Sequence, residues 1–283
     1  MLTTLCNHII PCLGNASGCL TTHKQYDLSN YFVVSKSCTI NPRQGNIQPR
    51  LYVDNNICIN SMGLPNQGLH YYTSYHPKGV YILSVYAYDV DELDELFNNN
   101  NKMIEVNLSC PNVNNNLLEQ IDIYLDKINK IKDNKIVGVK LPPFLYQHDI
   151  KDISFLLIKY NIDFITCCNT IPNCLVIKDD KTTLYNDVGG MSYKPLSLSN
   201  VFQFYKLLKN KIDIIGCGGI QTGQDVYDYI LCGATCVQIG AQILREGVEC
   251  LQRIDKELQD IMILKNYKNI NDFKGKIDLR SKL

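Results

Sequence analysis

Eight short apolar runs, spaced along the whole chain, constrain its fold more than any other feature of the sequence. Nearly every position in them is apolar, which is typical of parallel strands that are buried on both faces. They are Ile9–Leu13, Tyr31–Val34, Val80–Tyr86, Met103–Leu108, Ile136–Leu141, Ile162–Cys167, Ile212–Ile215 and Cys236–Ile239. The runs therefore predict one buried, largely parallel sheet.

Amphipathic segments separate most of the runs and predict helices on the outside of that sheet. They are Val90–Phe97, Leu117–Ile131, Ile150–Tyr160, Leu196–Lys209, Gly223–Cys232 and Glu246–Lys265. Asp89 and Thr222 precede two of them and suit helix N-caps. Eight strand-and-helix units in about 250 residues predict a (β/α)8 TIM barrel of the α/β class. A doubly wound sheet is the alternative, but it usually opens with a Gly-rich turn, which this chain lacks.

The domain organisation follows from length and composition. With 283 residues and 45% hydrophobic content, we expect one domain spanning residues 1–283. An insertion at residues 37–79, rich in Gly and Pro, should form small strands and loops that cap one barrel mouth. The formal net charge of zero argues against a nucleic-acid or anionic-membrane partner. The sequence lacks an apolar run of the roughly 20 residues that a membrane helix needs, and we expect a cytoplasmic protein.

The cysteines raise the question of disulfides or metal. The chain has 13 of them, an odd number, in a long sequence without an export signal, which argues against disulfides. Because it has no Cys-x-x-Cys pair and its 5 histidines are scattered, we expect no metal site. Most cysteines lie within apolar runs and should act as small buried hydrophobes.

Polar residues follow the predicted strands, where TIM barrels place their chemistry. The fourth strand leads into Asn107–Asn112, which combines carboxamides, a hydroxyl and the thiol of Cys110. Taken alone, this stretch is slightly better explained as a strand end with a buried cysteine. Lys36 and Lys140 end two other strands, and two lysines buried in one mouth require an anionic or polar partner. The sequence therefore predicts a polar ligand at this end.

Small residues after the last two predicted strands indicate a phosphate site. Gly218-Gly219 and Gly240-Ala241 lie where barrel backbone N–H groups commonly hold a phosphate, although each pair alone also suits an ordinary tight turn. In the insertion, the Gly and Pro of Asn60–Asn66 predict a rigid turn whose backbone N–H groups could receive a carboxylate. An ordinary polar lid loop is the alternative for that segment.

Four motifs, in this order, resemble the dihydroorotate dehydrogenase family. They are Asn60–Asn66, Asn107–Asn112, Gly138–Pro143 and Gly216–Ile220. The resemblance runs from about Cys6 to Ile277 and is strongest to class 1A, the fumarate-using branch. It implies a cytoplasmic, homodimeric flavoprotein, an oxidoreductase that uses FMN to convert dihydroorotate to orotate in pyrimidine biosynthesis. A cysteine at position 110 marks class 1, since the membrane-bound class has serine there.

The resemblance also implies roles for individual residues. Cys110 and Lys36 would be catalytic, with Cys110 taking the C5 proton while a hydride leaves C6 for flavin N5. The substrate would contact Lys36, Asn60, Met62, Gly63, Leu64, Asn107, Asn112, Asn169 and Thr170. FMN would contact Ser17, Gly18, Lys36, Ser37, Asn107, Lys140, Cys168, Gly189, Gly190, Gly218, Gly219, Gly240 and Ala241.

Some features depart from the family, and other functions stay open. The segments after Asn112 and around Leu69–Gly79 are shorter than usual, and Ala241 replaces a common threonine. The alternatives are a class 1B-like, NAD-coupled enzyme with an iron–sulfur partner subunit, an FMN barrel that reduces a tRNA base, and a degenerate flavin-binding scaffold. The C-terminal Ser281-Lys282-Leu283 matches a peroxisomal address, so a peroxisome-type organelle is the alternative location.

Overall fold

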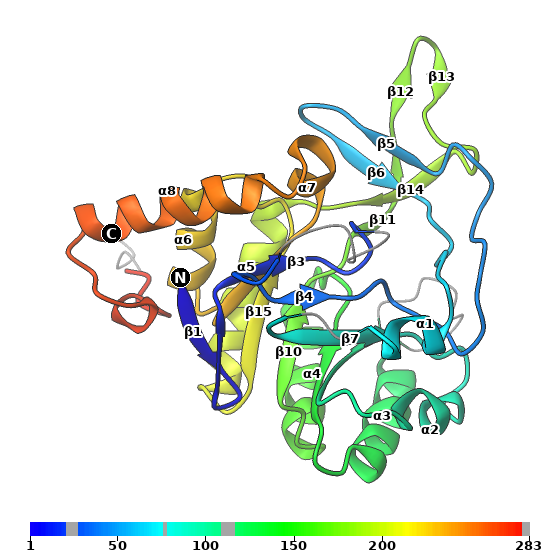
Figure 1. The fold of residues 1–283 in the computed structure, drawn as a ribbon, viewed down its shortest axis with the longest axis horizontal. Helices are drawn as coiled ribbons and strands as arrows, with labels where there is room; N and C mark the ends of the chain where they lie inside the picture. The colour runs from blue at the N-terminus through cyan, green and yellow to red at the C-terminus, as the bar shows by residue number, and fades with distance from the viewer. Residues whose placement is uncertain (21–27, 76–77, 109–116, 279–283) are drawn as a thin grey trace.

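The central sheet of the protein has eight parallel strands, arranged in the order β3-β16-β15-β10-β9-β8-β7-β4 (Figure 1). The computed structural model describes residues 1–20, 28–75, 78–108 and 117–278. The strands are β3 (Leu13–Asn15), β4 (Val33–Val34), β7 (Tyr81–Val85), β8 (Met103–Asn107), β9 (Ile136–Lys140), β10 (Phe164–Cys167), β15 (Asp213–Cys217) and β16 (Cys236–Ile239). All their pairings are parallel, and the predicted TIM barrel is confirmed.

The barrel closes between β3 and β4 through a side chain rather than a full backbone ladder. The backbone N–H of Phe32 donates to the carbonyl of Leu13 at 3.2 Å. One residue further along, the amide of Asn15 donates to the Val34 carbonyl at 2.7 Å and accepts from the Val34 N–H at 3.0 Å. Asn15 is fully buried. Its carboxamide thus satisfies both backbone groups of Val34 where the two strands diverge.

The first predicted strand, Ile9–Leu13, is wrong as a barrel strand. Residues 8–11 instead form β2 (His8–Pro11), an antiparallel partner of β1 (Leu2–Leu5). The two turn residues, Cys6 and Asn7, have φ of 47° and 65°, the left-handed conformation that a two-residue hairpin requires. The hairpin buries Leu5 and Ile10 against the barrel interior, and in Figure 1 it lies away from the cap. It therefore covers the amino end of the barrel.

Two aromatic rings fill the barrel interior at the end that this hairpin covers. Phe32 and Phe164 are fully buried there with other apolar side chains. Each ring lies over a glycine, because a Cβ on Gly14 would be 2.4 Å from Phe32 and one on Gly138 would be 2.2 Å from Phe164. This apolar plug leaves the other end of the barrel to polar side chains.

The predicted helices are confirmed, and they lie outside the sheet (Figure 1). They are α2 (Glu92–Phe97), α3 (Leu117–Ile131), α4 (Gln147–Lys159), α5 (Lys194–Leu208), α6 (Gly223–Leu231), α7 (Ala241–Glu246) and α8 (Cys250–Leu264), joined by the unpredicted α1 (Leu69–Thr73) and η2 (Ile270–Asp272). The last predicted helix is split at Gly247, whose φ is 82°. Thr222 caps α6 as expected, whereas Asp91 rather than Asp89 is the N-cap of α2.

A second, four-stranded sheet caps the barrel. Its order is β11-β14-β6-β5, formed by β5 (Leu51–Val53), β6 (Cys58–Asn60), β11 (Ile171–Leu175) and β14 (Val188–Met191). The small hairpin of β12 (Ile177–Lys178) and β13 (Lys181–Thr182) projects from it (Figure 1). The insertion at residues 37–79 supplies only half of this sheet. The other half comes from the segment after β10, which no sequence pattern singles out.

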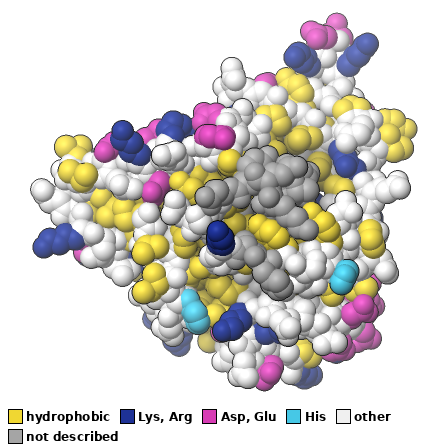
Figure 2. Space-filling model, in the orientation of Figure 1, with side chains coloured by type: hydrophobic (Ala, Val, Ile, Leu, Met, Phe, Trp, Pro, Cys, Tyr) yellow, Lys and Arg dark blue, Asp and Glu magenta, His cyan; other side chains and the backbone are white. Residues whose placement is uncertain are grey.

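The described surface carries mixed charge. Figure 2 shows basic and acidic side chains interspersed over the face in view, as a formal net charge of zero suggests. Within the part of the chain that the structure covers, we find no helix with the length and apolar character to cross a membrane.

Candidate active site

One cavity of about 940 Å³ lies where the barrel strands end below the cap sheet. Its volume is near the upper end of the range of about 300–1,000 Å³ that is typical of ligand sites. Every predicted site residue that the structure describes lines it: Ser17, Gly18, Lys36, Ser37, Asn60, Met62, Gly63, Leu64, Asn107, Lys140, Cys168, Asn169, Thr170, Gly189, Gly190, Gly218, Gly219, Gly240 and Ala241. Cys110 and Asn112 lie outside the described residues.

Two lysines give this cavity a positive character. Burial, together with repulsion from Lys140, lowers the pKa of Lys36 to about 8. Burial also acts to lower the pKa of Lys140, but attraction to Cys217 and Glu105 raises it above the ordinary lysine value. A Cβ on Gly18 would lie 2.8 Å from the Lys36 Nζ, so the glycine makes room for that ammonium group. Two cations in one buried space favour an anionic ligand.

A chain of hydrogen-bonded hydroxyl groups runs from one cavity wall into the barrel interior. The Oγ of Ser37 lies 2.9 Å from the Oγ of Ser17 and 2.9 Å from the Oγ of Ser84. The side-chain amide of Asn107, the last residue of β8, donates to Ser37 at 3.4 Å. Ser17, Ser37 and Asn107 line the cavity and offer donors and acceptors to a flat polar ligand. Ser84 is fully buried within β7 and lies behind Ser37.

The cap contributes a second wall. Asn60, at the end of β6, donates from Nδ2 to the carbonyl of Gly190 at 3.3 Å. Close approach requires glycine there, because a Cβ on Gly190 would lie 2.2 Å from the Oγ1 of Thr170. Asn169 accepts a hydrogen bond from the Thr170 N–H at 2.8 Å. The cap strands and the exit of β10 therefore meet across the cavity.

The turn at Met62, Gly63 and Leu64 is held from below by Asn46. The Asn46 N–H donates to the Met62 carbonyl at 2.9 Å, and its side-chain amide donates to the Ser61 carbonyl at 2.9 Å. Gly63 and Leu64 have φ of 68° and 56°. A Cβ on Gly63 would lie 2.3 Å from the Asn46 Oδ1. The turn is thus fixed by contacts that only glycine at this position permits.

The two glycine-containing exits lie side by side, because β15 pairs directly with β16. Gly218 and Gly219 have φ of 133° and 66°, where a side chain would be strained. The Tyr229 hydroxyl donates to the Gly218 carbonyl at 2.6 Å. Gly240 and Ala241 begin the segment that becomes α7. Residues of both exits line the cavity.

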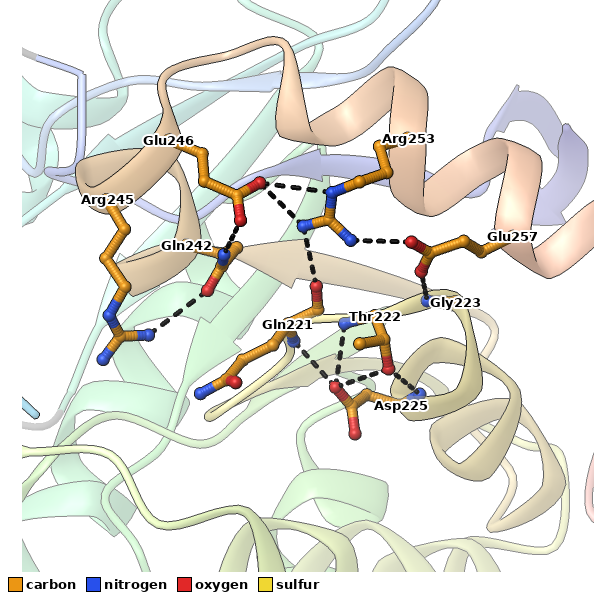
Figure 3. A network of polar contacts seen from close by, with 9 residues as sticks. All are labelled: Gln221, Thr222, Gly223, Asp225, Gln242, Arg245, Glu246, Arg253 and Glu257. Atoms are coloured by element: carbon orange, nitrogen blue, oxygen red, sulfur yellow. Dashed lines mark hydrogen bonds and ion pairs between the residues drawn. The ribbon is translucent and has the colours of Figure 1, made fainter. Parts of the chain in front are cut away.

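A polar network from α8 supports these two exits from outside (Figure 3). The Arg253 guanidinium donates to the Gln221 carbonyl at 3.1 Å and to Glu246 of α7 at 2.7 Å. It also donates to Glu257 at 2.8 Å, and Glu257 accepts from the Gly223 N–H at 2.7 Å. One arginine therefore links the loop after β15 to α7.

Several cavity residues have no assigned role in the sequence-based prediction. Tyr86 and Tyr88 follow β7 and line the cavity. The Arg43 guanidinium lies 4.9 Å from the centre of the Tyr88 ring, a cation–π contact. The two tyrosines could have been predicted as site residues, because they occupy alternate positions at the end of an apolar run and so point to the same side. Arg43 lies in the insertion, whose sequence has no periodic pattern that predicts which side chains face the cavity.

Known proteins match this chain over most of its length. A family model described as "Dihydroorotate dehydrogenase" matches residues 2–262. A protein of Streptococcus pyogenes serotype M5 (strain Manfredo), named "Putative dihydroorotate dehydrogenase A (fumarate)", is 36% identical over 297 residues, covering 94% of each chain. A protein of the same name from Streptococcus agalactiae serotype V (strain ATCC BAA-611 / 2603 V/R) is 37% identical over 296 residues, with the same coverage.

Solved structures agree on the fold. The ligand-free DHODH of Eimeria tenella superposes with a TM-score of 0.79 at 20% identity, covering 97% of this chain and 91% of that one. The ferulenol complex of the Eimeria tenella enzyme gives a TM-score of 0.78 at 20% identity, covering 97% and 88%. At that identity the likeness supports the barrel architecture alone.

Proposed function

The chain belongs to the dihydroorotate dehydrogenase family, and from that membership we propose an FMN-dependent, fumarate-using enzyme of the class 1A type. It is an oxidoreductase that converts dihydroorotate to orotate in pyrimidine biosynthesis. One observation carries the finer proposal: all the described residues that the family resemblance assigns to flavin and substrate line the same cavity.

The donor set of the cavity fits FMN. A flavin needs hydrogen-bonding groups along one ring edge, a cation near its electron-rich side and a phosphate site at the end of its ribityl chain. The Ser17–Ser37 hydroxyls, Lys140 and the Gly218-Gly219 and Gly240-Ala241 exits are groups of these three kinds. When bound, the flavin supplies the acceptor for a hydride. Lys140 would lie against the ring edge, and Cys168, Gly189 and Gly190 would complete the ring site.

The substrate is a flat ring with amide groups and a carboxylate. Asn60, Asn107 and Asn169 present carboxamides to the cavity, with Asn112 and Thr170 as further partners in this proposal. Such amides discriminate strongly, because a mismatched ligand leaves them buried without a partner. The backbone at Met62, Gly63 and Leu64 would receive the carboxylate, and Lys36 would add its charge.

The proton chemistry falls to Cys110. In the proposal its Sγ takes the proton from C5 of dihydroorotate as the hydride leaves C6. A free thiol has a pKa of about 8.5, so a nearby cation that favours the thiolate makes it a better base at neutral pH. Lys36 is the cation that we assign to this side of the cavity.

Fumarate is proposed as the electron acceptor because the curated relatives carry it in their name. We test this with the purified chain alone, supplied with dihydroorotate and either fumarate or NAD under anaerobic conditions. Turnover with fumarate supports the class 1A assignment. Turnover only with NAD and an added partner subunit would instead identify the class 1B type.

Assembly and location complete the proposal. We propose a cytoplasmic homodimer, with no nucleic-acid partner, consistent with mixed surface charge and a formal net charge of zero. Size-exclusion chromatography with light scattering measures the assembly, and a monomer would contradict it.

Ser281-Lys282-Leu283 lies outside the described residues, and imaging with and without Leu283 separates cytoplasm from a peroxisome-type organelle.

A further inference from the structure

A buried carboxyl group lies inside the barrel beneath the cavity. Glu105 is on β8, two residues before Asn107, and none of its surface is exposed to solvent. The rest of β8 before Asn107 is apolar, so a carboxylate here is costly unless it is well hydrogen-bonded. It does not line the cavity, and no step of the proposed reaction uses it. Its presence therefore needs a physical explanation.

Three neutral side chains from three other strands donate to Glu105. The Thr166 hydroxyl of β10 lies 2.6 Å from Oε2, and the Gln238 Nε2 of β16 lies 2.6 Å from the same oxygen. The Ser84 hydroxyl of β7 lies 3.5 Å from Oε1 and also contacts Ser37 in the cavity wall. These contacts organise a polar layer between the apolar plug and the cavity.

The carboxyl group fixes which way the Gln238 amide points. A glutamine amide has a donor end and an acceptor end of nearly equal shape. Because Glu105 can accept but not donate when ionised, Gln238 must turn its Nε2 toward it. The Gln238 Oε1 then faces Lys140, whose Nζ donates to it at 3.4 Å. The reverse orientation would place an amide oxygen against a carboxylate and an N–H group against an ammonium.

We propose that Glu105 is a positioning residue that, through the Gln238 amide, aims the Lys140 ammonium at the ring of the bound flavin. The inference rests on the proposed FMN site. Lys140 itself is 5% exposed at the end of β9, and among the described residues the Gln238 Oε1 is the hydrogen-bond acceptor that its ammonium meets. Attraction to Glu105 is also one of the causes that hold the pKa of Lys140 high despite burial.

A double-mutant cycle tests this coupling. We compare Glu105→Gln, Lys140→Met and the double variant, starting from the purified flavin-loaded protein, and measure the dissociation constants of FMN and of riboflavin by fluorescence quenching. Glu105→Gln should weaken both flavins about tenfold, because the ring that Lys140 contacts is common to both. In the Lys140→Met background the same change should have no further effect.

A matched control separates positioning from simple damage to the buried layer. Thr166→Val removes the hydrogen bond to Glu105 and a longer 3.4 Å contact from the Gln238 Nε2, but it leaves the 2.6 Å Gln238–Glu105 bond and the Lys140–Gln238 bond intact. Its effect should add to that of Lys140→Met. Gln238→Met breaks the line without changing the charge of Glu105, and it should reproduce the loss seen in Glu105→Gln. If Glu105→Gln does not fold, Gln238→Met carries the test.

The pH profile offers a second readout. In Glu105→Gln, Lys140 loses an attractive charge, so its pKa should fall and flavin binding should weaken with rising pH at a lower pH than in the wild type. In the double variant, which lacks the Lys140 ammonium group, the flavin dissociation constant should no longer show this dependence on pH. Additive effects in the cycle, or equal behaviour of Thr166→Val and Glu105→Gln, would overturn the inference while leaving the FMN proposal standing. A wild-type chain that binds no flavin would overturn both.

Discussion

Lys36 provides the most direct link between the electrostatics of the cavity and substrate binding. Burial and the charge of Lys140 lower its pKa to about 8. With that value, Lys36 is about nine-tenths charged at pH 7 and about one-tenth charged at pH 9. If the anionic substrate or product binds only the charged form, its affinity is nearly full at pH 7, is halved at about pH 8 and is lost as pH rises further. We expect orotate to bind about tenfold more weakly at pH 9 than at pH 7.

The assay uses the flavin-loaded protein and follows orotate binding by the change in flavin absorbance at several pH values. Lys36→Arg is the matched variant, because a guanidinium keeps its charge throughout this range. Any titration of the ligand itself affects both proteins equally. The wild-type constant should rise with pH while that of Lys36→Arg stays flat. Parallel curves for the two proteins would refute the reasoning.

Three further changes test other parts of the site and the fold. Asn15→Leu leaves the N–H and carbonyl of Val34 unpaired, so the free energy of unfolding measured in urea should fall by about 2–5 kcal/mol. The same substitution at the exposed Asn100 is the control and should change that free energy by less than about 0.5 kcal/mol. Equal stability of the two variants would contradict the account of barrel closure. Arg253→Met should weaken FMN about fivefold and leave riboflavin unchanged, because it disturbs only the exits assigned to the phosphate, and exposed Lys256→Met is the control. Equal losses for both flavins would rule out that role. Cys110→Ser should lower steady-state turnover at neutral pH by a factor on the order of 100 with FMN still bound, and unchanged turnover would exclude Cys110 as the base.

The barrel could be predicted from sequence because its strands are buried on both faces. Seven of the eight apolar runs became barrel strands, since a run such as Met103–Leu108 has few other ways to bury itself. The prediction for the first run was wrong because an apolar run does not show whether its residues join the barrel sheet or form a hairpin that covers the end of the barrel. Ile10 is buried in the hairpin, while its neighbour Ile9 is 72% exposed. What makes these residues a hairpin is the left-handed turn at Cys6 and Asn7.

The cap shows the limit of pattern reasoning. Strands such as β11 and β12 leave Leu175 and Ile177 exposed, so they lack the buried face that creates a readable alternation. The cap sheet also depends on the pairing of β14 with β6, which joins segments more than a hundred residues apart, as Gly190 and Asn60 illustrate. Sequence spacing alone could not place these segments together.

The site itself was largely predictable, because a TIM barrel brings its strand ends together whatever the sequence between them. Lys36, Asn107 and Lys140 could therefore be grouped from their positions at the ends of apolar runs. Glu105 could not, because its partners Thr166 and Gln238 lie 61 and 133 residues away along the chain. A single charge inside an apolar run is visible in sequence, but what it contacts is a property of the folded barrel.

Anaerobic reduction of the bound flavin by dihydroorotate tests the central claim most directly. The purified protein should be yellow, and dihydroorotate added without any other acceptor should bleach the flavin absorbance near 450 nm to completion, with orotate formed in equal amount to the flavin. A protein that carries flavin and keeps its colour with excess dihydroorotate would contradict the assignment of this cavity to dihydroorotate oxidation.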